Sequence, residues 1–234
     1  MKYTFDSRVR YSEVDHTGRM TVPNVINYFQ DCSTFQSEDI GVGLETLKAK
    51  HRGWLLASWQ VKFVRAPKMG EKITVGTFAH AFKGFFGSRN FFMDDADGQH
   101  LAYANSVWFF VDSEKGRPVR PEPEDIEPYG IEEPLEMEYR ERKIKLSEQT
   151  TACEPFPIRR YHIDTNEHVN NAQYVQMAME FLPRDMEVKE LRVEYKLAAV
   201  LGDVIYPKVA MEENRSVVEL CDEAGAQYAV VEFS

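Results

Sequence analysis

Two halves of the sequence follow one plan, and this internal repeat constrains the fold more than any other feature of the chain. When Val14 is placed on Ile163, two segments with helical spacing come into register. The stretches QVKFVRAPKMGE (60–71) and RVEYKLAAVLGD (192–203) then agree in their aromatic, Ala and Gly-acid positions, and DADGQHLA agrees with DEAGAQYA. Repeats of this length indicate one structural unit that is present twice.

Each half contains one helical pattern and about five strand-like stretches. In the first half the apolar residues follow helical spacing from residue 21 onward, and Pro23 suits a first helical turn. In the second half, residues 170–183 predict a helix of about 15 residues, with one face formed by Tyr174, Val175, Ala178 and Leu182. The strand-like stretches span 54–67, 71–82, 88–95 and 100–112 in the first half, and 157–164, 189–211, 215–225 and 226–233 in the second.

A proline-dense segment separates the two halves. It predicts an extended linker over about residues 116–145, because proline is excluded from central strands and helix interiors. We therefore expect an N-terminal domain of residues 1–130, which includes the start of the linker, and a C-terminal domain of residues 131–234. One long helix beside an antiparallel sheet in each half predicts an α+β fold in which the sheet wraps a central helix. The prolines are Pro118, Pro121, Pro123, Pro128 and Pro134.

Composition argues against several classes of function. The formal net charge is −10, from 28 basic and 38 acidic residues, and nucleic-acid binding needs a basic surface instead. No apolar run approaches the roughly 20 residues that span a bilayer. The first residues carry charge throughout, so we expect no membrane segment and no signal or transit peptide.

Side chains that bind metals or cofactors are also scattered. The three cysteines fit neither a disulfide framework nor a zinc site, and they favour a cytoplasmic protein; they are Cys32, Cys153 and Cys221. The six His show no metal-ligand spacing, and no glycine-rich segment has the Lys-Ser/Thr of a phosphate loop. We expect no metal and no cofactor.

The segment YHIDTNEHVNNAQY (161–174) crowds polar side chains just before the second helical pattern. Asp164, Asn166 and His168 stand at every second position, so an extended chain would point all three the same way. Asp or Asn before a helix is most often an N-cap, and we expect Asn170 or Asn171 to be the cap here. The cap leaves the upstream trio free for chemistry.

Residues 104–125 (ANSVWFFVDSEKGRPVRPEPED) and 164–174 (DTNEHVNNAQY) resemble the acyl-acyl-carrier-protein (acyl-ACP) thioesterases, in particular bacterial members, and the resemblance covers nearly the whole chain. It implies two tandem hotdog folds with the catalytic residues in the second. It also implies a thioester hydrolase that releases free fatty acid from acyl-ACP and so terminates fatty acid synthesis.

By this resemblance, Asp164, Asn166 and His168 match the family's Asp-x-Asn-x-His positions. Thioester hydrolysis needs an activated water and a stabilised oxyanion, and a helix N-terminus supplies unpaired N–H groups. We expect His168 to act as general base or to orient the water, and Asn166 to hold the thioester or the water. Asp164 would fix the Asn–His pair or activate the water itself.

The sequence departs from the plant members at one place. Where they carry a Glu-Cys pair, this chain has Ala198 and Ala199, which exclude a Cys nucleophile there and remove a carboxylate. Asp164, Glu167 or Glu194 would then supply the acid, and the sequence leaves the choice open.

A thiol–imidazole pair of Cys153 and His168 is a further alternative for the chemistry. An incidental Cys is the simpler interpretation of Cys153, because this residue stands at the end of the predicted linker.

The first half is expected to be catalytically silent and to bind the acyl chain. It keeps Asp15 but has Thr17 and Arg19 at the positions that Asn166 and His168 occupy in the second half. Residues available to line an apolar tunnel are Phe29, Trp54, Leu56, Trp59, Phe91 and Trp108, although core packing would explain most of them equally well. The expected substrate-binding residues are Asn171, Tyr174, Trp54 and Trp59.

The expected partner is acyl carrier protein with a phosphopantetheine-linked acyl chain, and the chain itself is expected to be a monomer or a homodimer. One basic group is either a solvated face or the docking site of this acidic partner, and docking would then weaken with salt. The group comprises Arg140, Arg142, Lys143, Lys145, Arg159 and Arg160. An acyl-CoA thioesterase and a non-catalytic acyl-thioester-binding module remain alternative functions.

Overall fold

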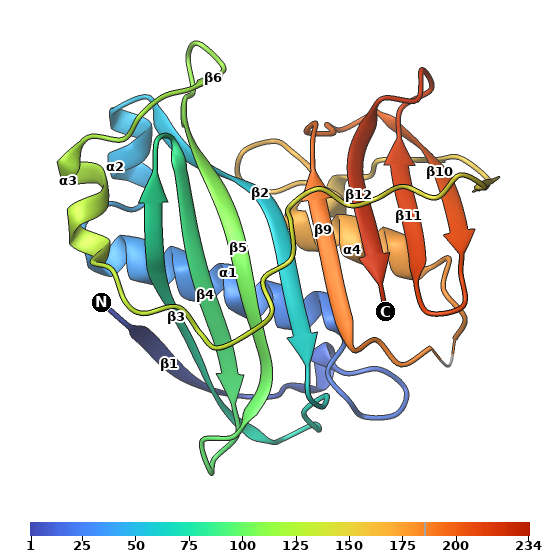
Figure 1. Ribbon diagram of the computed structural model, residues 1–234, viewed down its shortest axis with the longest axis horizontal. Coiled ribbons are helices and arrows are strands. Elements are labelled where there is room, and N and C mark those ends of the chain that lie inside the picture. Colours follow the sequence, from blue (N-terminus) through green and yellow to red (C-terminus); the bar gives the residue numbers. More distant parts are fainter. Residues whose placement is uncertain (185) are drawn as a thin grey trace. The chain divides into compact units, whose positions relative to one another are not determined.

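The computed structural model describes residues 1–184 and 186–234. The chain forms two compact units: Met1–Ala57 and Val61–Tyr139 make up the first, and Ser58–Gln60 and Arg140–Ser234 make up the second (Figure 1). Each unit has its own set of antiparallel strands with a helix against one face, as expected of an α+β chain. In the described residues no helix is long and apolar enough to cross a membrane.

The strands of the first unit follow the order β1-β3-β4-β5-β2. The pairs β1–β3, β3–β4 and β4–β5 are antiparallel. The strands are β1 (Tyr3–Arg8), β2 (Arg52–Phe63), β3 (Lys72–Lys83), β4 (Phe86–Asp94), β5 (His100–Asp112) and β6 (Arg117–Pro118), which pairs with β5. The helical segments are η1 (Tyr11–Glu13), α1 (Val22–Asp39), α2 (Leu44–Ala49), α3 (Pro123–Ile126) and η2 (Glu127–Tyr129).

Helix α1 forms where the apolar spacing predicted it. Thr21 precedes its first residue, and Pro23 lies in the first turn, where a missing N–H costs no hydrogen bond. Its inner face contacts β1 and β3, and the ring centroids of Phe29 and Phe91 on β4 are 5.4 Å apart. Burial of such side chains, worth roughly 1.5–3 kcal/mol each, holds the helix against the sheet.

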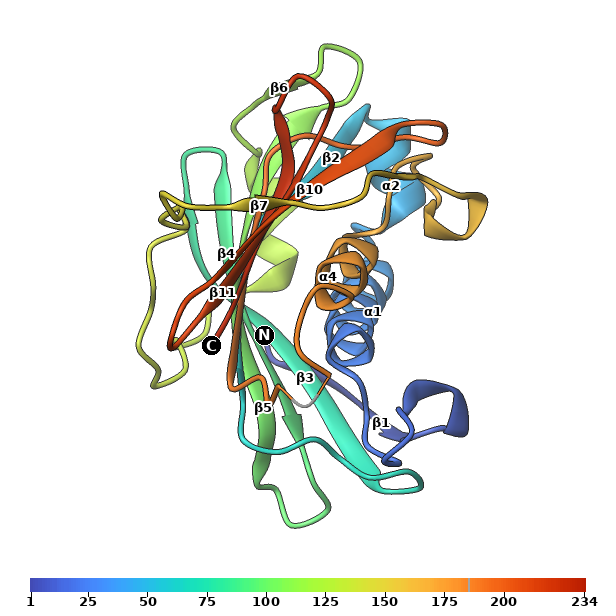
Figure 2. The same cartoon turned by 90° about the vertical axis from the view of Figure 1, so that its right-hand side faces the viewer.

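The strands of the second unit follow the order β9-β12-β11-β10-β7, and β8 pairs with β10. Every neighbouring pair is antiparallel among those the structure describes. Figure 2 shows helix α4 against one face of this sheet. The elements are β7 (Thr151–Ala152), β8 (Phe156–Pro157), η3 (Arg160–His162), α4 (Asn171–Met179), β9 (Glu190–Tyr195), β10 (Val204–Met211), β11 (Ser216–Cys221) and β12 (Gln227–Phe233).

The two units repeat one another at the entrances of their helices. η1 and the bridge between Val14 and Met20 correspond to η3 and the bridge between Ile163 and Val169. Helices α1 and α4 then begin at equivalent positions, and β1 pairs with β3 as β8 pairs with β10. The internal repeat predicted from the sequence is confirmed.

Two elements predicted for the second half differ from the structure. Helix α4 has 9 residues and ends at Met179, so Leu182 lies beyond it; Pro183 disfavours helical backbone in the residue before it. Residues 157–164, predicted as a strand, form only the end of β8 and then η3. There the N–H of Arg159 donates to Nδ1 of His162 at 2.9 Å and closes a tight turn.

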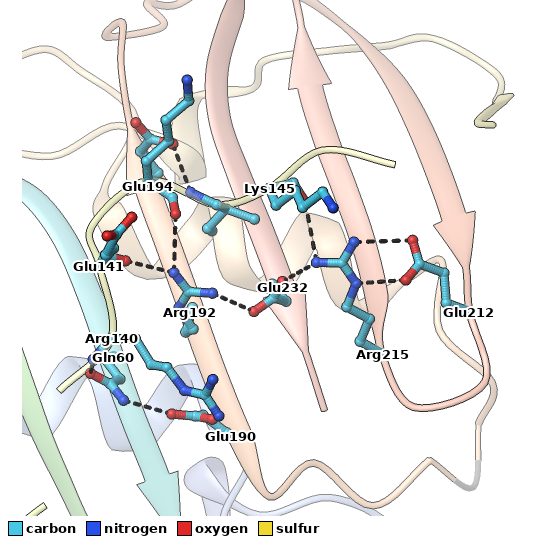
Figure 3. Close-up of polar contacts among 12 residues, drawn as sticks. Gln60, Arg140, Glu141, Lys145, Glu190, Arg192, Glu194, Glu212, Arg215 and Glu232 are labelled. Carbon is cyan, nitrogen blue, oxygen red and sulfur yellow. Dashed lines mark hydrogen bonds and ion pairs between the residues drawn. The ribbon is translucent and has the colours of Figure 1, made fainter. Parts of the chain in front are cut away.

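Residues 140–147 cross the face of the second sheet that is opposite α4 (Figure 3). Arg192 on β9 donates to the carbonyls of Glu141 and Lys143 at 2.6 and 3.2 Å. Glu194, two residues along the same strand, accepts a hydrogen bond from the N–H of Ile144 at 3.3 Å. Because side chains alternate along a strand, Glu190, Arg192 and Glu194 all face away from α4.

The same face carries a network of ion pairs. Arg192 and Arg215 both bind Glu232, at 2.7 and 2.8 Å, and Arg215 binds Glu212 at 2.7 Å. Hydrogen bonds from Arg215 and Ser147 lower the pKa of Glu212 to about 2. A depression of 500 Å³ lies among these groups. Three Arg and four Glu side chains line it, and it lies on the opposite face from the helix whose entrance carries the predicted catalytic residues.

Ile144 anchors the crossing segment, because it is 1% exposed and packs against Val217 and Val230. We predict that Ile144→Ala lowers the free energy of unfolding by about 2–5 kcal/mol, through lost burial and the cavity left behind. The matched variant Leu146→Ala, at a side chain that is 40% exposed, should change it by less than about 0.5 kcal/mol. Urea unfolding followed by circular dichroism measures both, and equal effects would contradict the anchoring role.

Candidate functional site

The predicted catalytic residues lie on a tight turn that connects η3 to α4. The N–H of Asp164 donates to the carbonyl of His168 at 2.8 Å, and the N–H of Glu167 donates to the carbonyl of Asp164 at 3.1 Å. The chain therefore reverses between these residues. The expectation that the segment stays extended through residue 168 is wrong, because these backbone hydrogen bonds favour the turn.

The turn brings Asp164, Asn166 and His168 together without joining their side chains. Asp164 is half-buried, whereas Asn166 and His168 are exposed. Oδ1 of Asp164 accepts a hydrogen bond from the backbone N–H of Asn166 at 2.8 Å. Within the described ranges no hydrogen bond joins the side chain of one of the three to the side chain of another. The two exposed groups are consequently accessible to a substrate.

Glu167 has an unusual backbone conformation for its residue type. Its φ is +61°, in the left-handed region, and the equivalent residue in the first unit is Gly18, with φ +75°. Glycine adopts this conformation without a steric penalty, whereas an L-residue with a side chain is strained there by of order 1–3 kcal/mol. The second unit therefore keeps a Glu at a position where the fold favours Gly.

Asn170 is the N-cap of α4, which settles the alternative between Asn170 and Asn171. Its side chain accepts a hydrogen bond from the N–H of Ala172 at 2.9 Å, and its carbonyl accepts from Gln173 at the same distance. The cap thus uses two N–H groups of the helix entrance that were expected to be open to an oxyanion.

The turn is attached to the segment that contains Ala198 and Ala199. The N–H of Val169 donates to the carbonyl of Ala199 at 2.9 Å, and His168 forms an antiparallel bridge with Val200. Ala198 and Ala199 therefore lie next to the candidate catalytic residues.

Tyr174 fixes Ala199 from the helix side. Its hydroxyl accepts a hydrogen bond from the N–H of Ala199 at 2.9 Å. Burial raises the pKa of Tyr174 to about 12, and the nearby charges of Asp203 and Asp164 contribute to the rise. The phenol consequently stays protonated and can donate. The equivalent residues in the first unit are Val25, which has no hydroxyl, and Pro67, which has no N–H.

The structure distinguishes among Asp164, Glu167 and Glu194, the three residues that the sequence left open as the acid of the site. Glu194 faces away from α4 and contacts the crossing segment, so it does not reach the turn. Asp164 and Glu167 are both on the turn. Asp203 was not considered from the sequence; its Oδ2 accepts from the N–H of Val200 at 2.9 Å and from the hydroxyl of Tyr228 at 3.2 Å.

A comparison of the two units assigns Asp203 to the framework. In the first unit Glu71 accepts a hydrogen bond from the N–H of Lys68 at 2.8 Å, as Asp203 does from Val200. This shared contact could have been predicted from the sequence, because Gly70-Glu71 in the first half aligns with Gly202-Asp203 in the second. Asp15 likewise accepts from the N–H of Thr17 at 2.7 Å, as Asp164 does from Asn166.

The other predicted substrate-binding residues are found in ordinary packing contacts. The ring of Trp54 lies 4.8 Å from that of Phe110 in the first unit, and Trp59 belongs to the second unit and is 2% exposed. The carbonyl of Asn171 accepts from the hydroxyl of Tyr195 at 3.0 Å. These contacts do not test a role in binding, so Trp54, Trp59, Asn171 and Tyr174 remain predictions in that respect.

The remaining tunnel residues also lie in the first unit. Phe29, Leu56 and Phe91 are buried, and Trp108 is half-buried with its indole N–H donating to Ser106 at 2.7 Å. Cys153 is half-buried, and its thiol lies 3.8 Å from the carbonyl of Thr151. Within the described residues no three His, Cys, Asp or Glu side chains are grouped as metal ligands would be.

Exchange of Glu167 tests the strain in the turn. We predict that Glu167→Gly raises the free energy of unfolding by roughly 1 kcal/mol, because Gly adopts the left-handed conformation freely. The matched exchange Gly18→Glu in the first unit should lower it by at least about the same amount. Both values follow from urea unfolding at neutral pH. A destabilised Glu167→Gly variant would show that the Glu side chain makes a compensating contact.

His162 couples the turn to pH. Its Nδ1 accepts from Arg159, and burial lowers the pKa of His162, with a further contribution from the charge of Arg159. The stabilisation is therefore complete above the unfolded-state pKa of about 6.5 and is lost as the pH falls through the lower native pKa.

We predict that the wild type loses stability relative to His162→Gln between about pH 7 and pH 5, because Gln can accept the same hydrogen bond without titrating. Unfolding free energies of the two proteins across this range measure the difference. A constant difference between them would contradict the coupling.

Comparisons with known proteins support one family. The family model described as acyl-ACP thioesterase N-terminal domain matches residues 1–129, and the model described as acyl-ACP thioesterase C-terminal domain matches residues 145–231.

Two plant relatives are similar in sequence. A chloroplastic palmitoyl-acyl carrier protein thioesterase of Cuphea hookeriana is 30% identical over 174 residues, which cover 69% of this chain and 41% of the relative. A chloroplastic oleoyl-acyl carrier protein thioesterase of Arabidopsis thaliana is 22% identical over 90% of this chain and 63% of the relative. The chain thus spans about half the length of these relatives.

Two solved structures share the fold. An acyl-ACP thioesterase from Bacteroides thetaiotaomicron superposes with a TM-score of 0.90 at 24% identity, covering 99% of this chain and 96% of the other. A 12:0-ACP thioesterase from Umbellularia californica superposes with a TM-score of 0.86 at 18% identity, covering 100% and 96%. These likenesses show a fold with a large antiparallel sheet and few helices.

Proposed function

Because the chain belongs to the acyl-ACP thioesterase family, we propose that it hydrolyses the thioester of acyl-ACP. Water adds to the thioester carbonyl, the C–S bond breaks, and the products are a free fatty acid and the carrier protein with a free thiol. In this proposal the two units are tandem hotdog folds. The first unit binds the acyl chain and is catalytically silent, and the second unit carries the catalytic groups.

The difference between the two copies of the helix-entrance turn carries the proposal. Both copies have the same backbone hydrogen bonds and an Asp that accepts from the residue two positions on. Only the second copy places an amide and an imidazole, Asn166 and His168, where the first has Thr17 and Arg19. A framework that is kept while its exposed side chains change indicates that those side chains serve chemistry.

We assign His168 as the general base that takes a proton from the attacking water. Its imidazole is exposed on the turn, and His is the side chain that most often transfers protons in general acid–base catalysis. Asn166, also exposed, holds the water or the thioester through its amide. Asp164 positions both residues, since its Oδ1 holds the turn at Asn166.

The developing oxyanion needs a donor that the helix cap has not used. The hydroxyl of Tyr174 accepts from Ala199 and keeps its own proton, so we propose that it donates to the substrate. This contact exists only in the second unit, because Val25 and Pro67 replace its two partners in the first. Donors aimed at an oxyanion are among the largest contributions to acyl-transfer catalysis.

The acid that replaces the absent Glu is then Glu167 or Asp164, because Glu194 faces away from the turn. We favour Glu167, since its strained backbone is retained where Gly would relieve it. Glu167→Gly would in that case lose activity while gaining stability.

The partner in this proposal is acyl carrier protein with a phosphopantetheine-linked acyl chain, and the compartment is the cytoplasm. Cys32, Cys153 and Cys221 are free thiols, which suits a reducing environment.

The proposed base is tested by thiol release from acyl-ACP and from the matching acyl-CoA, over a series of chain lengths. We predict that His168→Ala lowers kcat/KM for acyl-ACP by about 10²–10⁴-fold, which is the usual contribution of a general base. Asn166→Ala should also lower it.

Matched controls come from the first unit: Thr17→Ala and Arg19→Ala should leave kcat/KM within about twofold. Full activity of a folded His168→Ala protein would refute the assignment. Equal turnover of acyl-CoA and acyl-ACP would favour the acyl-CoA thioesterase, and binding without turnover of either would favour the acyl-thioester-binding module.

A further inference from the structure

Large apolar side chains are exposed around the turn that carries His168. Leu197, Val200 and Leu201 are 51%, 41% and 55% exposed, and Tyr161 is 76% exposed. Exposed apolar groups that gather at one place, unlike those scattered singly, indicate a binding surface.

Backbone contacts place these side chains beside the candidate site. Val200 bridges His168 directly, and Leu201 is its neighbour in sequence. Tyr161 belongs to η3, which is tied to the helix entrance because the carbonyl of His162 accepts from the N–H of Asn170 at 2.8 Å. The N–H of Ile158 donates to the carbonyl of Asp203 at 2.8 Å, so the chain before η3 adjoins the end of the 197–203 segment.

The first unit exposes Tyr11, Val64 and Met69 on the equivalent segments, but it differs at most of the four positions named above. The residue equivalent to Leu197 is Arg65, which forms ion pairs with Glu71 and Asp95 at 2.6 and 3.1 Å. Lys68 stands where Val200 stands in the second unit. Only Leu201 has an apolar counterpart, Met69. Because the backbone contacts are shared, the fold does not require aliphatic side chains at these positions.

Two arginines border the apolar residues. Arg159 and Arg160 are exposed, and in the part of the chain that the structure describes neither has a carboxylate within ion-pair distance. The equivalent of Arg159 in the first unit, Arg10, is paired with Glu13 at 3.7 Å. On a chain with a formal net charge of −10, unpaired guanidinium groups beside the site favour an acidic partner.

The other basic residues of the group predicted from the sequence lie elsewhere. Arg140, Arg142, Lys143 and Lys145 belong to the segment that crosses the sheet face opposite α4. Carboxylates surround this segment, among them Glu212 and Glu232 (Figure 3). The structure therefore divides that group, and only Arg159 and Arg160 adjoin the turn.

We propose that Tyr161, Leu197, Val200 and Leu201, bordered by Arg159 and Arg160, form the docking surface for the acidic carrier protein that delivers the thioester to His168. This inference rests on the proposed function. An apolar centre with Tyr and a rim with Arg is the usual composition of a protein–protein interface. The small size of the surface suits a transient complex that must dissociate after each turnover.

Kinetics with two substrates test the docking surface. One substrate is acyl-ACP, and the other is the N-acetylcysteamine thioester of the same acyl chain, which has the thioester but no carrier protein. We predict that Arg159→Glu/Arg160→Glu and Leu197→Gln/Leu201→Gln each raise KM for acyl-ACP by about tenfold or more. The kcat/KM for the small thioester should change by less than about twofold, which also shows that the variants are folded.

The matched control is Arg10→Glu/Met69→Gln, which makes equivalent changes in the first unit and should leave KM for acyl-ACP unchanged. Raising the ionic strength from about 0.05 M to about 0.3 M should increase KM of the wild type for acyl-ACP, and this increase should shrink in the double Arg variant.

Direct binding separates failure of this inference from failure of the proposed function. Titration of fluorescently labelled acyl-ACP gives Kd for each protein whether or not hydrolysis occurs. Unchanged Kd and KM in both double variants would overturn the docking surface, even if the wild type is an active thioesterase. If the wild type binds acyl-ACP but hydrolyses neither substrate, and both double variants bind acyl-ACP more weakly, the proposed function is overturned and the docking surface is supported.

Sedimentation of the same proteins tests whether the apolar residues instead form a dimer interface. If Leu197→Gln/Leu201→Gln converts a dimer to a monomer and leaves binding of acyl-ACP unchanged, the apolar residues cover a second copy of the chain, and the docking proposal is overturned. An unchanged sedimentation coefficient together with weakened binding supports it.

Discussion

The hydrogen bonds between the 163–169 turn and the Ala199–Val200 segment determine where every candidate catalytic group lies. Val169 donates to the carbonyl of Ala199, and Tyr174 accepts from the N–H of the same residue. Ala199 is thereby held by the turn on one side and by the helix on the other. An imidazole must keep its position to within fractions of an ångström to act on a bound water. The side chain of His168 is exposed, so its backbone has to fix its position. The proposed chemistry therefore depends on the hydrogen bonds that hold Ala199 to Val169 and Tyr174.

Comparison of the two units separates residues that support the turn from residues that are available for catalysis. The geometry of the second unit alone separates them less clearly. Asp164 could be taken for a catalytic acid, yet Asp15 makes the same contact in a unit that lacks the amide and the imidazole. His162 could be taken for a second base, yet it performs the task of Glu13, which accepts from the N–H of Arg10 at 2.8 Å. The shared framework does not explain the Tyr174–Ala199 contact, or the Glu side chain at residue 167, where the first unit has Gly18 in the same left-handed conformation.

The sequence predicted the parts of this arrangement that depend on local patterns. The repeat, the helix entrances and a cap at Asn170 or Asn171 follow from spacing and from capping chemistry. The turn at Asp164 was missed because alternation was assumed where an Asp side chain binds the backbone two residues on; Gly18 in the aligned copy was the available signal. The orientation of Glu194 could not be predicted, because it depends on residues 140–147, which pack on that face from a distant part of the sequence.

The strain at Glu167 bears on which carboxylate acts beside His168 in the proposed mechanism. On the adjoining segment, residues 198 and 199 are alanines and Asp203 is bonded to the N–H of Val200. The face of β9 that carries Glu194 is closed by Ile144. In the proposed mechanism, a carboxylate near the imidazole therefore comes from the turn itself. Asp164 already uses one oxygen to hold the backbone, as its counterpart does. Glu167 has no such duty, and its conformation costs free energy that Gly would save. The strain at this exposed position therefore supports the proposal that the Glu167 side chain takes part in the reaction.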